Sequence, residues 1–267
     1  MANRSGGTGM SITQDVAFRG STLRVLTAGD DNRDTIGYLH GMIGTPRRHP
    51  ILAPLAATAR RVVAPNLPGF SGSAACADIR SLHDWVVATS EVIDVVGLTG
   101  CHLVAASVGA MLALEVAAVR PEAFSRLTLI APFGLWDDDD PTTDPFATTL
   151  SNQRALLTDD PTVTSCFFDD QPGRGPADLV DDNVTRYATR TAAASLVWPI
   201  PEFGLATRIH RVTCPVALIW GARDRLVPVS YLGRFAALLS NVTATHIIAN
   251  AGHLADWDQP AAIAALI

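Results

Sequence analysis

The chain has 267 residues, of which 48% are hydrophobic and 17% charged, a composition typical of a globular protein with one sizeable core, with or without an inserted subdomain. Its formal net charge of −6 disfavours nucleic acid as a partner. All 20 basic residues are Arg, which excludes Schiff-base chemistry on lysine and a P-loop, because both require a lysine.

Short runs of apolar and β-branched residues alternate with helical segments along the chain. The predicted strands are Ile12–Phe18, Thr22–Thr27, Asp34–Leu39, Arg61–Pro65, Cys101–Ala105, Leu127–Ala131, Val216–Trp220 and Thr243–Ile248. The predicted helices are Pro50–Ala59, Ser81–Gly97, Val108–Val119, Tyr231–Leu239 and a last one from Pro260 onward. The first two strands are close enough for a hairpin, and the alternation predicts an α/β fold with a mostly parallel sheet of about eight strands covered on both faces.

The stretch between the sixth and seventh strands breaks this alternation. It opens near the acidic run Asp137–Asp140, is rich in proline, and contains helical segments at Pro145–Leu157 and Val180–Ser195. An insertion that interrupts an α/β alternation, which then resumes, indicates a cap on the parent domain. We therefore expect a flexible leader at residues 1–10, a core at residues 11–132 and 209–267, and a cap at residues 133–208.

A serine stands where the fifth strand meets the next helix, in the segment Val-Ala-Ala-Ser-Val-Gly-Ala at residues 104–110. A serine at such a junction sits on a tight turn with its hydroxyl exposed above the sheet. Ala105 and Gly109 occupy the two glycine positions of the G-x-S-x-G pattern around Ser107, so one glycine is replaced. Ser107 is a candidate nucleophile, and a serine that caps a buried helix is the alternative.

A histidine–glycine pair, His40 and Gly41, follows the third strand. Gly41 lets the loop backbone approach a site, and the N–H of Met42 can then join the N–H of Val108 as an oxyanion donor. His40 is a candidate substrate contact, and a hydrogen-bonded structural histidine is the alternative.

An acid and a histidine follow the last two strands. Asp224 lies just beyond the seventh strand, where open α/β sheets place their sites, and His253 directly follows the eighth. A loop aspartate paired with a neighbouring arginine and a surface histidine at a helix start are the alternatives. Asp137–Asp140 compete for the role of the acid, but this proline-bounded run is interpreted as a solvated cap entrance, which favours Asp224.

The order of Ser107, Asp224 and His253, each after a strand, is the order typical of α/β hydrolases. From about Thr22 to its end the chain resembles this superfamily. Its segment Asn-Leu-Pro-Gly-Phe-Ser-Gly-Ser at residues 66–73 is similar to the family's D-x-P-G-x-G-x-S loop. Residues 198–221 more loosely resemble the cap exit of the branch that contains meta-cleavage-product C–C hydrolases and related esterases.

The resemblance implies an α/β-hydrolase fold with a helical cap and a serine hydrolase mechanism. Ser107 would attack an acyl carbon, His253 would transfer the proton, and Asp224 would orient the imidazole. The candidate substrate contacts are His40, Trp136, Phe146 and Trp198. Aromatic side chains favour a small apolar or aromatic substrate, with an ester, thioester or lactone as the bond cleaved. The alternatives are a C–C bond hydrolase of vinylogous diketones, a cofactor-free perhydrolase and a non-catalytic ligand-binding protein.

The sequence predicts no metal and no cofactor, since it has no HExxH motif, CxxC pair or clustered histidines, and no G-x-G-x-x-G follows a strand. Scattered cysteines favour reduced thiols and the cytoplasm. The longest apolar stretch, residues 103–119, is interrupted by polar residues and short for a membrane span. We therefore expect a small-molecule substrate and neither nucleic acid nor membrane as a partner, and a homodimer is compatible with the sequence.

Overall fold

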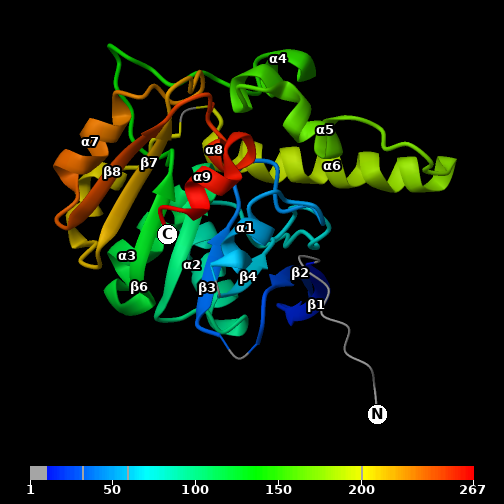
Figure 1. Ribbon diagram of the computed structural model, residues 1–267, viewed down its shortest axis with the longest axis horizontal. Helices are drawn as coiled ribbons and strands as arrows, with labels where there is room; N and C mark the ends of the chain where they lie inside the picture. Colours follow the sequence, from blue (N-terminus) through cyan, green and yellow to red (C-terminus); the bar gives the residue numbers. More distant parts are fainter. Residues whose placement is uncertain (1–10, 32, 59, 200) are drawn as a thin grey trace.

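The computed structural model describes residues 11–31, 33–58, 60–199 and 201–267, so the leader predicted at residues 1–10 lies outside the described residues. Over this part of the chain eight strands form one sheet in the order β1-β2-β4-β3-β5-β6-β7-β8 (Figure 1). They are β1 (Ile12–Phe18), β2 (Ser21–Ala28), β3 (Thr35–Leu39), β4 (Arg61–Pro65), β5 (Cys101–Ala106), β6 (Phe124–Ile130), β7 (Val216–Gly221) and β8 (Val242–Ile248). β2 pairs antiparallel with β1 and β4, and the other neighbours pair parallel.

Helices cover both faces of the sheet. They are α1 (Leu52–Ala57), α2 (Leu82–Val95), α3 (Ser107–Val119), α4 (Leu150–Leu157), α5 (Ser165–Phe168), α6 (Pro176–Val197), α7 (Tyr231–Leu238), α8 (Ala255–Asp258) and α9 (Pro260–Ala264). Apolar residues of α2, α3 and α7 share one buried cluster, those of α1 and α9 share a second, and α8 contributes Trp257 to the first and Ala255 to the second. The predicted α/β fold with a mostly parallel sheet is confirmed.

Strand β5 shows why the central strands are apolar at every position. Leu103 and Ala105 belong to the cluster on one face of the sheet, and Val104 and Ala106 belong to the cluster on the other. Successive side chains of a strand point to opposite faces, so a strand covered on both sides must be apolar throughout. This buried strand delivers its carboxyl end to the helix start at Ser107.

The segment between β6 and β7 contains α4, α5 and α6, which Figure 1 shows together at one end of the molecule, with α6 extending beyond the sheet. The first predicted cap helix is shorter than expected, because Asp144 Oδ1 accepts the N–H groups of Phe146 and Ala147 in a turn. The second begins earlier, because Pro176 fits the first position of a helix. The cap boundaries at residues 133 and 208 stay a prediction.

A buried ion pair joins the end of the cap segment to the core. Arg208 donates two hydrogen bonds, at 2.5 and 2.6 Å, to the carboxylate of Glu115, which lies in the middle of α3. Glu115 is 2% exposed, so removal of Arg208 would leave its buried carboxylate without this partner. In the described part of the chain, no helix is both long and apolar enough to cross a membrane.

Candidate active site

Ser107 lies at the turn between β5 and α3, as the first residue of the helix, with a φ of +55°. The left-handed conformation is unfavourable for a residue with a β-carbon, and such strain persists where the surrounding structure imposes it. The turn also needs close backbone contact, because a Cβ on Gly109 would lie 2.3 Å from the carbonyl oxygen of His40. The strand–turn–helix context predicted for Ser107 is therefore present.

The structure brings the three predicted triad residues together. His253 Nε2 lies 2.7 Å from Ser107 Oγ, and His253 Nδ1 lies 2.9 Å from Asp224 Oδ2. Ser107 is 0% exposed, and so are the side chains of the other two residues. Because a carboxylate only accepts, His253 donates from Nδ1, which leaves Nε2 free to accept the hydroxyl proton of Ser107.

The acid is held by its own loop just after β7. Asp224 Oδ1 accepts the backbone N–H groups of Leu226 and Val227, each at 2.9 Å. One carboxylate oxygen is thus fixed by the backbone, and the other, Oδ2, faces His253. This division of the two oxygens orients the carboxylate toward the imidazole.

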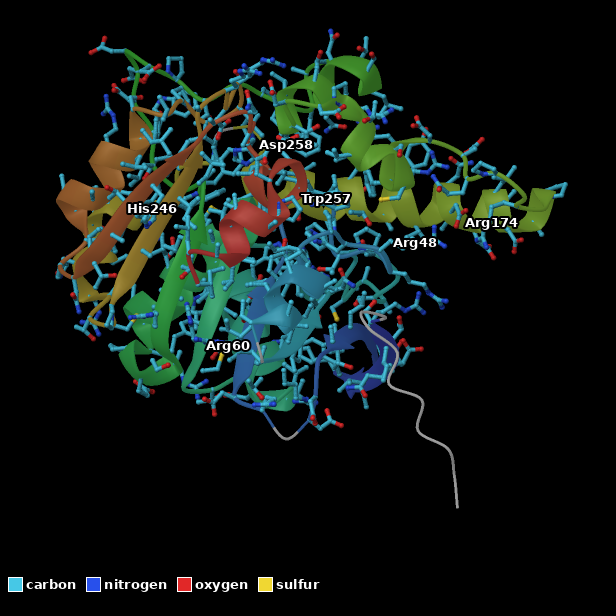
Figure 2. All side chains as sticks on the ribbon, in the orientation of Figure 1. Arg48, Arg60, Arg174, His246, Trp257 and Asp258 are labelled. Atoms are coloured by element: carbon cyan, nitrogen blue, oxygen red, sulfur yellow. The ribbon has the colours of Figure 1, made fainter. Side chains whose placement is uncertain are left out.

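The loop that carries His253 lies against both β7 and the cap segment. A Cβ on Gly221 would lie only 2.0 Å from the carbonyl oxygen of Gly252, so the loop can approach β7 only at a glycine. Asp258 lies on α8 (Figure 2), and its Oδ2 accepts the N–H of Gly252 at 2.7 Å. On the other side, the N–H of Leu254 donates to the carbonyl of Leu157 at 2.7 Å. His253 is therefore held from both sides along the backbone.

Gly221→Ala should displace the His253 loop. We expect the free energy of unfolding to fall by about 1–3 kcal/mol, because the added methyl group overpacks against the backbone. We expect kcat to fall by about 100-fold, because the imidazole is slightly displaced. Urea unfolding and steady-state kinetics on a simple ester measure both. Gly233→Ala on α7 is the matched control, because its Cβ would meet nothing within 4 Å. Equal behaviour of the two variants would contradict the predicted displacement of the loop.

The loop after β3 passes directly beside the nucleophile. A Cβ on Gly41 would lie 3.2 Å from Ser107 Cβ and 2.8 Å from Leu254 Cδ2. Met42 follows Gly41, and Val108 is the second residue of α3, where a backbone N–H has no acceptor one turn back in the helix. Both predicted oxyanion donors therefore belong to segments that meet at Ser107.

His40 supports this loop from within the core. Its ring is fully buried: Nε2 accepts the N–H of Leu67 at 3.0 Å, and Nδ1 donates to the carbonyl of Gly41 at 2.8 Å. Burial lowers the pKa of His40 to about 4, so the ring is neutral at physiological pH. With both nitrogens used by backbone groups, His40 acts here as the structural histidine of the alternative interpretation.

A small pocket of about 50 Å³ is connected to the triad through one of its lining residues, Phe133. Phe133 lines it and also meets the His253 ring, with centroids 5.2 Å apart. Of the predicted substrate contacts Trp136 lines this pocket, whereas Phe146 is half-buried elsewhere and Trp198 is 58% exposed. The other lining residues are Thr142, Thr143, Asp144, Pro145, Val197, Pro199 and Pro201. Sequence reasoning missed the prolines and Val197, because only the folded cap brings them together.

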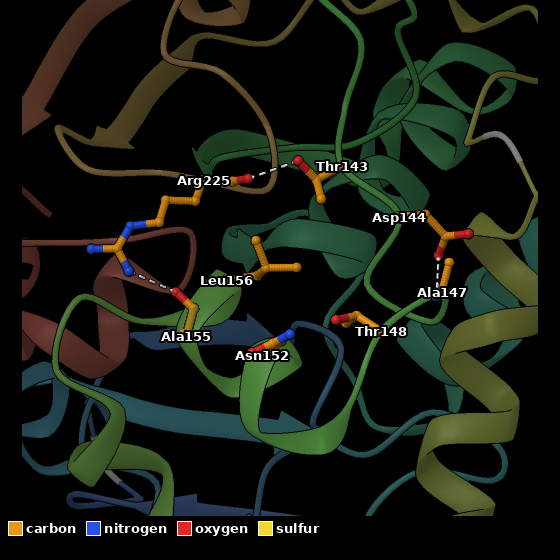
Figure 3. A pocket seen from close by; sticks show the side chains of 8 residues that line it. All are labelled: Thr143, Asp144, Ala147, Thr148, Asn152, Ala155, Leu156 and Arg225. Carbon is orange, nitrogen blue, oxygen red and sulfur yellow. Dashed lines mark hydrogen bonds between the residues drawn. The ribbon is translucent and has the colours of Figure 1, made fainter.

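A larger pocket of about 440 Å³ shares Thr143 and Asp144 with the small one (Figure 3). The acid loop forms part of its wall: Arg225 accepts a hydrogen bond from Thr143 Oγ1 through its carbonyl and donates to the carbonyl of Ala155, both at 2.9 Å. The other lining residues are Ala147, Thr148, Asn152 and Leu156. The small pocket thus adjoins a larger one, and both have mainly apolar walls.

The acidic run Asp137–Asp140 is anchored on α7, which corrects its interpretation as a solvated entrance. Asp137 pairs with Arg234, and its N–H donates to Tyr231 Oη at 3.0 Å. Tyr231 in turn donates to the carbonyl of Asp140 at 3.0 Å. Only Asp138 and Asp139 are exposed. Asp137 is occupied by α7, and it is Asp224 that contacts His253.

The structure also bears on metal binding. Among the residues it describes, no three His, Cys, Asp or Glu side chains are grouped in a way that could hold a metal ion. Activation of Ser107 requires only a base beside its hydroxyl, and His253 is placed to be that base.

Comparisons with known proteins agree with this fold. The sequence model of the alpha/beta hydrolase family matches residues 38–266. The chain is 25% identical over 258 residues to a 2-hydroxy-6-oxononadienedioate/2-hydroxy-6-oxononatrienedioate hydrolase of Pseudomonas putida, with 86% of this chain and 84% of that protein covered. A solved meta-cleavage product hydrolase of Pseudomonas fluorescens is 18% identical, with a TM-score of 0.72 and 95% of each chain covered.

An esterase has the same fold. Naproxen esterase of Bacillus subtilis is 16% identical, with a TM-score of 0.69, 96% of this chain and 90% of that chain covered. The two solved structures show the fold, and the family model covers well over half of the sequence. The chain belongs to the alpha/beta hydrolase family, as a hydrolytic enzyme of the serine type.

Proposed function

We propose that this enzyme cleaves a carboxylic ester-type bond, in an ester, thioester or lactone, of a small apolar or aromatic substrate through an acyl-enzyme on Ser107. The observation that carries the proposal is the continuous hydrogen-bonded chain from Ser107 Oγ through His253 to Asp224, at 2.7 and 2.9 Å. A serine becomes nucleophilic when an adjacent base accepts its proton and a third group orients that base.

In the first half-reaction, Ser107 Oγ bonds to the carbonyl carbon and His253 Nε2 takes the hydroxyl proton. The carbonyl oxygen becomes an oxyanion, which the N–H groups of Val108 and Met42 stabilise together with the positive end of the α3 dipole. The bond to the leaving group then breaks, and His253 gives its proton to that group. Asp224 stabilises the imidazolium throughout and does not itself take the proton.

In the second half-reaction, water attacks the acyl carbon. His253 removes one proton from the water, a second oxyanion forms in the same place, and the bond to Ser107 Oγ breaks with return of the proton to the serine. The products are a carboxylic acid and the alcohol, thiol or ring-opened hydroxy acid. Phe133, Trp136 and the prolines of the small pocket support an apolar acyl group, and Asn152 and Arg225 of the larger pocket offer hydrogen-bond donors to a leaving group.

The second candidate function is hydrolysis of a C–C bond in a vinylogous diketone. The names of two relatives favour it: the Pseudomonas putida hydrolase named above, and a 2-hydroxy-6-oxo-6-phenylhexa-2,4-dienoate hydrolase of Burkholderia cepacia that is 24% identical over 223 residues. This reaction differs in its leaving group, since a carbon atom must receive the proton. The same triad serves both reactions, so the substrate decides between them.

Fluorophosphonate labelling with intact mass and peptide mapping tests the activated serine. We expect one adduct on Ser107 that is lost in His253→Ala. Turnover of p-nitrophenyl and thiophenyl esters of short and aromatic acids is then compared with turnover of a vinylogous diketone. Faster cleavage of the esters supports the proposal, and faster cleavage of the diketone supports the second candidate. A folded protein without an adduct, or an adduct without turnover of any substrate, contradicts the proposed function.

A further inference from the structure

Behind the triad lies a second cluster of polar side chains with no part in the mechanism above. Tyr38 on β3, His49 before α1 and Asp256 in the first turn of α8 are all completely buried, on the face of the sheet that α1 covers. Tyr38 donates a short hydrogen bond to Asp256 Oδ2, and its hydroxyl lies 3.0 Å from His49 Nε2. His49 Nε2 is also 3.6 Å from the same carboxylate oxygen.

The hydrogen bonds in this cluster run in one direction. The backbone N–H of Ile51 donates to His49 Nδ1 at 3.4 Å, so neutral His49 carries its proton on Nε2. That N–H donates to the oxygen of Tyr38, whose hydroxyl donates to Asp256. A chain of donors that ends on a carboxylate polarises toward it and favours the ionised form.

The cluster therefore holds one buried negative charge that neither Tyr38 nor His49 neutralises. Burial lowers the pKa of His49 well below its usual value and raises that of Tyr38, so both stay neutral. Burial raises the pKa of Asp256 to about 6, which leaves it largely ionised at neutral pH. Its Oδ1 has no hydrogen-bond partner among the described residues. A buried anion of this kind destabilises the resting fold.

The titratable groups that face Asp256 show what can use the charge. Tyr38 and His49 contact it from β3 and the loop before α1, and the charges of Asp258 and His253 act on it from its own segment. Asp258 is acidic and opposes the charge, whereas a positive charge on His253 stabilises it. His253 is therefore the one group in this set that supplies a cation, and it does so when it takes the proton of Ser107.

The same contact also ties two parts of the site together. Tyr38 lies two residues before His40, on the strand that leads into the oxyanion loop, and Asp256 lies three residues after His253. A hydrogen bond between them fixes the histidine loop relative to that strand.

We propose that Asp256 is a positioning residue that acts through His253: it anchors the histidine loop to β3 and supplies a second buried negative charge that stabilises the imidazolium. This inference rests on the proposed role of His253 as the base. Since the imidazole gains a positive charge when it takes the proton of Ser107, a fixed negative charge beside it favours the transition state over the resting enzyme.

The test is the pH dependence of kcat for a p-nitrophenyl ester in three variants. Asp256→Asn keeps the size of the side chain and removes the charge. We expect a plateau about tenfold lower, with KM within twofold, and an acid limb displaced to lower pH, because a less stabilised imidazolium loses its proton more readily. A tenfold effect corresponds to one pKa unit of lost imidazolium stabilisation.

Tyr38→Phe keeps the charge and removes its main hydrogen bond. Loss of the donor raises the pKa of Asp256 further, so ionisation is completed at higher pH. We expect a plateau close to that of the wild type, reached at higher pH, which is the opposite displacement from Asp256→Asn. Leu55→Ala, which truncates a buried residue of the same apolar cluster, is the stability control and should lower Tm without moving the limb.

Stability gives a second readout that does not need turnover. The pKa of Asp256 in the folded protein is raised from 3.8 to about 6, so destabilisation by the ionised group is fully present above about pH 6 and is lost progressively as pH falls from 6 to about 3.8. The Tm of Asp256→Asn relative to the wild type should therefore rise from about pH 4 to pH 6 and level off above it.

Two outcomes would overturn the inference and leave Asp256 with only a structural role. One is the same pH profile for Asp256→Asn, Leu55→Ala and the wild type. The other is displacement of the acid limb in the same direction in Asp256→Asn and Tyr38→Phe. If Asp256→Asn does not fold, Tyr38→Phe alone decides by the direction of its displacement. Wild-type protein that is not labelled at Ser107 contradicts the proposed function instead, so the two failures are distinguishable.

Discussion

Ser107→Ala should reduce kcat for ester hydrolysis by roughly 10⁴–10⁶-fold and abolish fluorophosphonate labelling, while Tm changes by only a few degrees. The methyl group of alanine removes the atom that bonds to the acyl carbon. The fold loses little, because the hydroxyl makes one hydrogen bond, to His253, and the turn is held by backbone contacts around Gly109. Single-turnover kinetics, mass spectrometry and thermal unfolding measure the three quantities.

The residual activity of Ser107→Ala is informative. The oxyanion donors and the pocket remain in place, so some acceleration over the uncatalysed reaction is expected. An alanine variant with more than one per cent of wild-type activity would contradict the acyl-enzyme, because that activity would have to come from direct attack of water. A large fall in Tm would instead mean that the Ser107 turn depends on its side chain.

Asp224→Asn should lower kcat by about 10⁴-fold with little loss of stability. The asparagine Oδ1 still accepts the N–H groups of Leu226 and Val227, so the acid loop keeps its shape. Its NH₂ group, however, donates where the carboxylate accepted, which forces the proton of His253 onto Nε2. A proton there prevents His253 from acting as the base for Ser107. Steady-state kinetics with a p-nitrophenyl ester check the loss.

Asp137→Asn is the control, because Asp137 was the competing candidate for the acid. It pairs with Arg234 on α7, a partly exposed contact, so its loss should change kcat less than threefold. A large loss in Asp137→Asn with a small loss in Asp224→Asn would assign the acid to the cap entrance and contradict the triad.

Much of the architecture follows from local patterns in the sequence. The strands of the parallel sheet were predictable because a strand buried on both faces, such as β5, must be apolar along its length. The elbow was predictable because a serine flanked by small residues, between such a strand and an apolar helix, is typical of a nucleophile turn. Asp224 and His253 were identified by their places after β7 and β8, since the ends of parallel strands meet at one edge of a sheet.

Contacts between distant segments could not be predicted in this way. Whether His40 faced the substrate or the core depended on Leu67, which donates its N–H to the ring from 27 residues away. The anchoring of the acidic run depended on Tyr231 and Arg234, on a helix far along the chain. Neither contact leaves a periodic pattern in the sequence, because each joins single residues and not whole helices or strands.

The sequence alone thus determined the class of fold and the residues of the candidate triad, because both are encoded in short segments: the alternation of apolar residues, and small residues around Ser107 and His253. Only the tertiary structure decided which aromatic residues line the small pocket, and that Asp256 lies buried against Tyr38, 218 residues away. Burial and hydrogen-bond partners are properties of the packed chain, so they exist only once the strands and the cap are assembled.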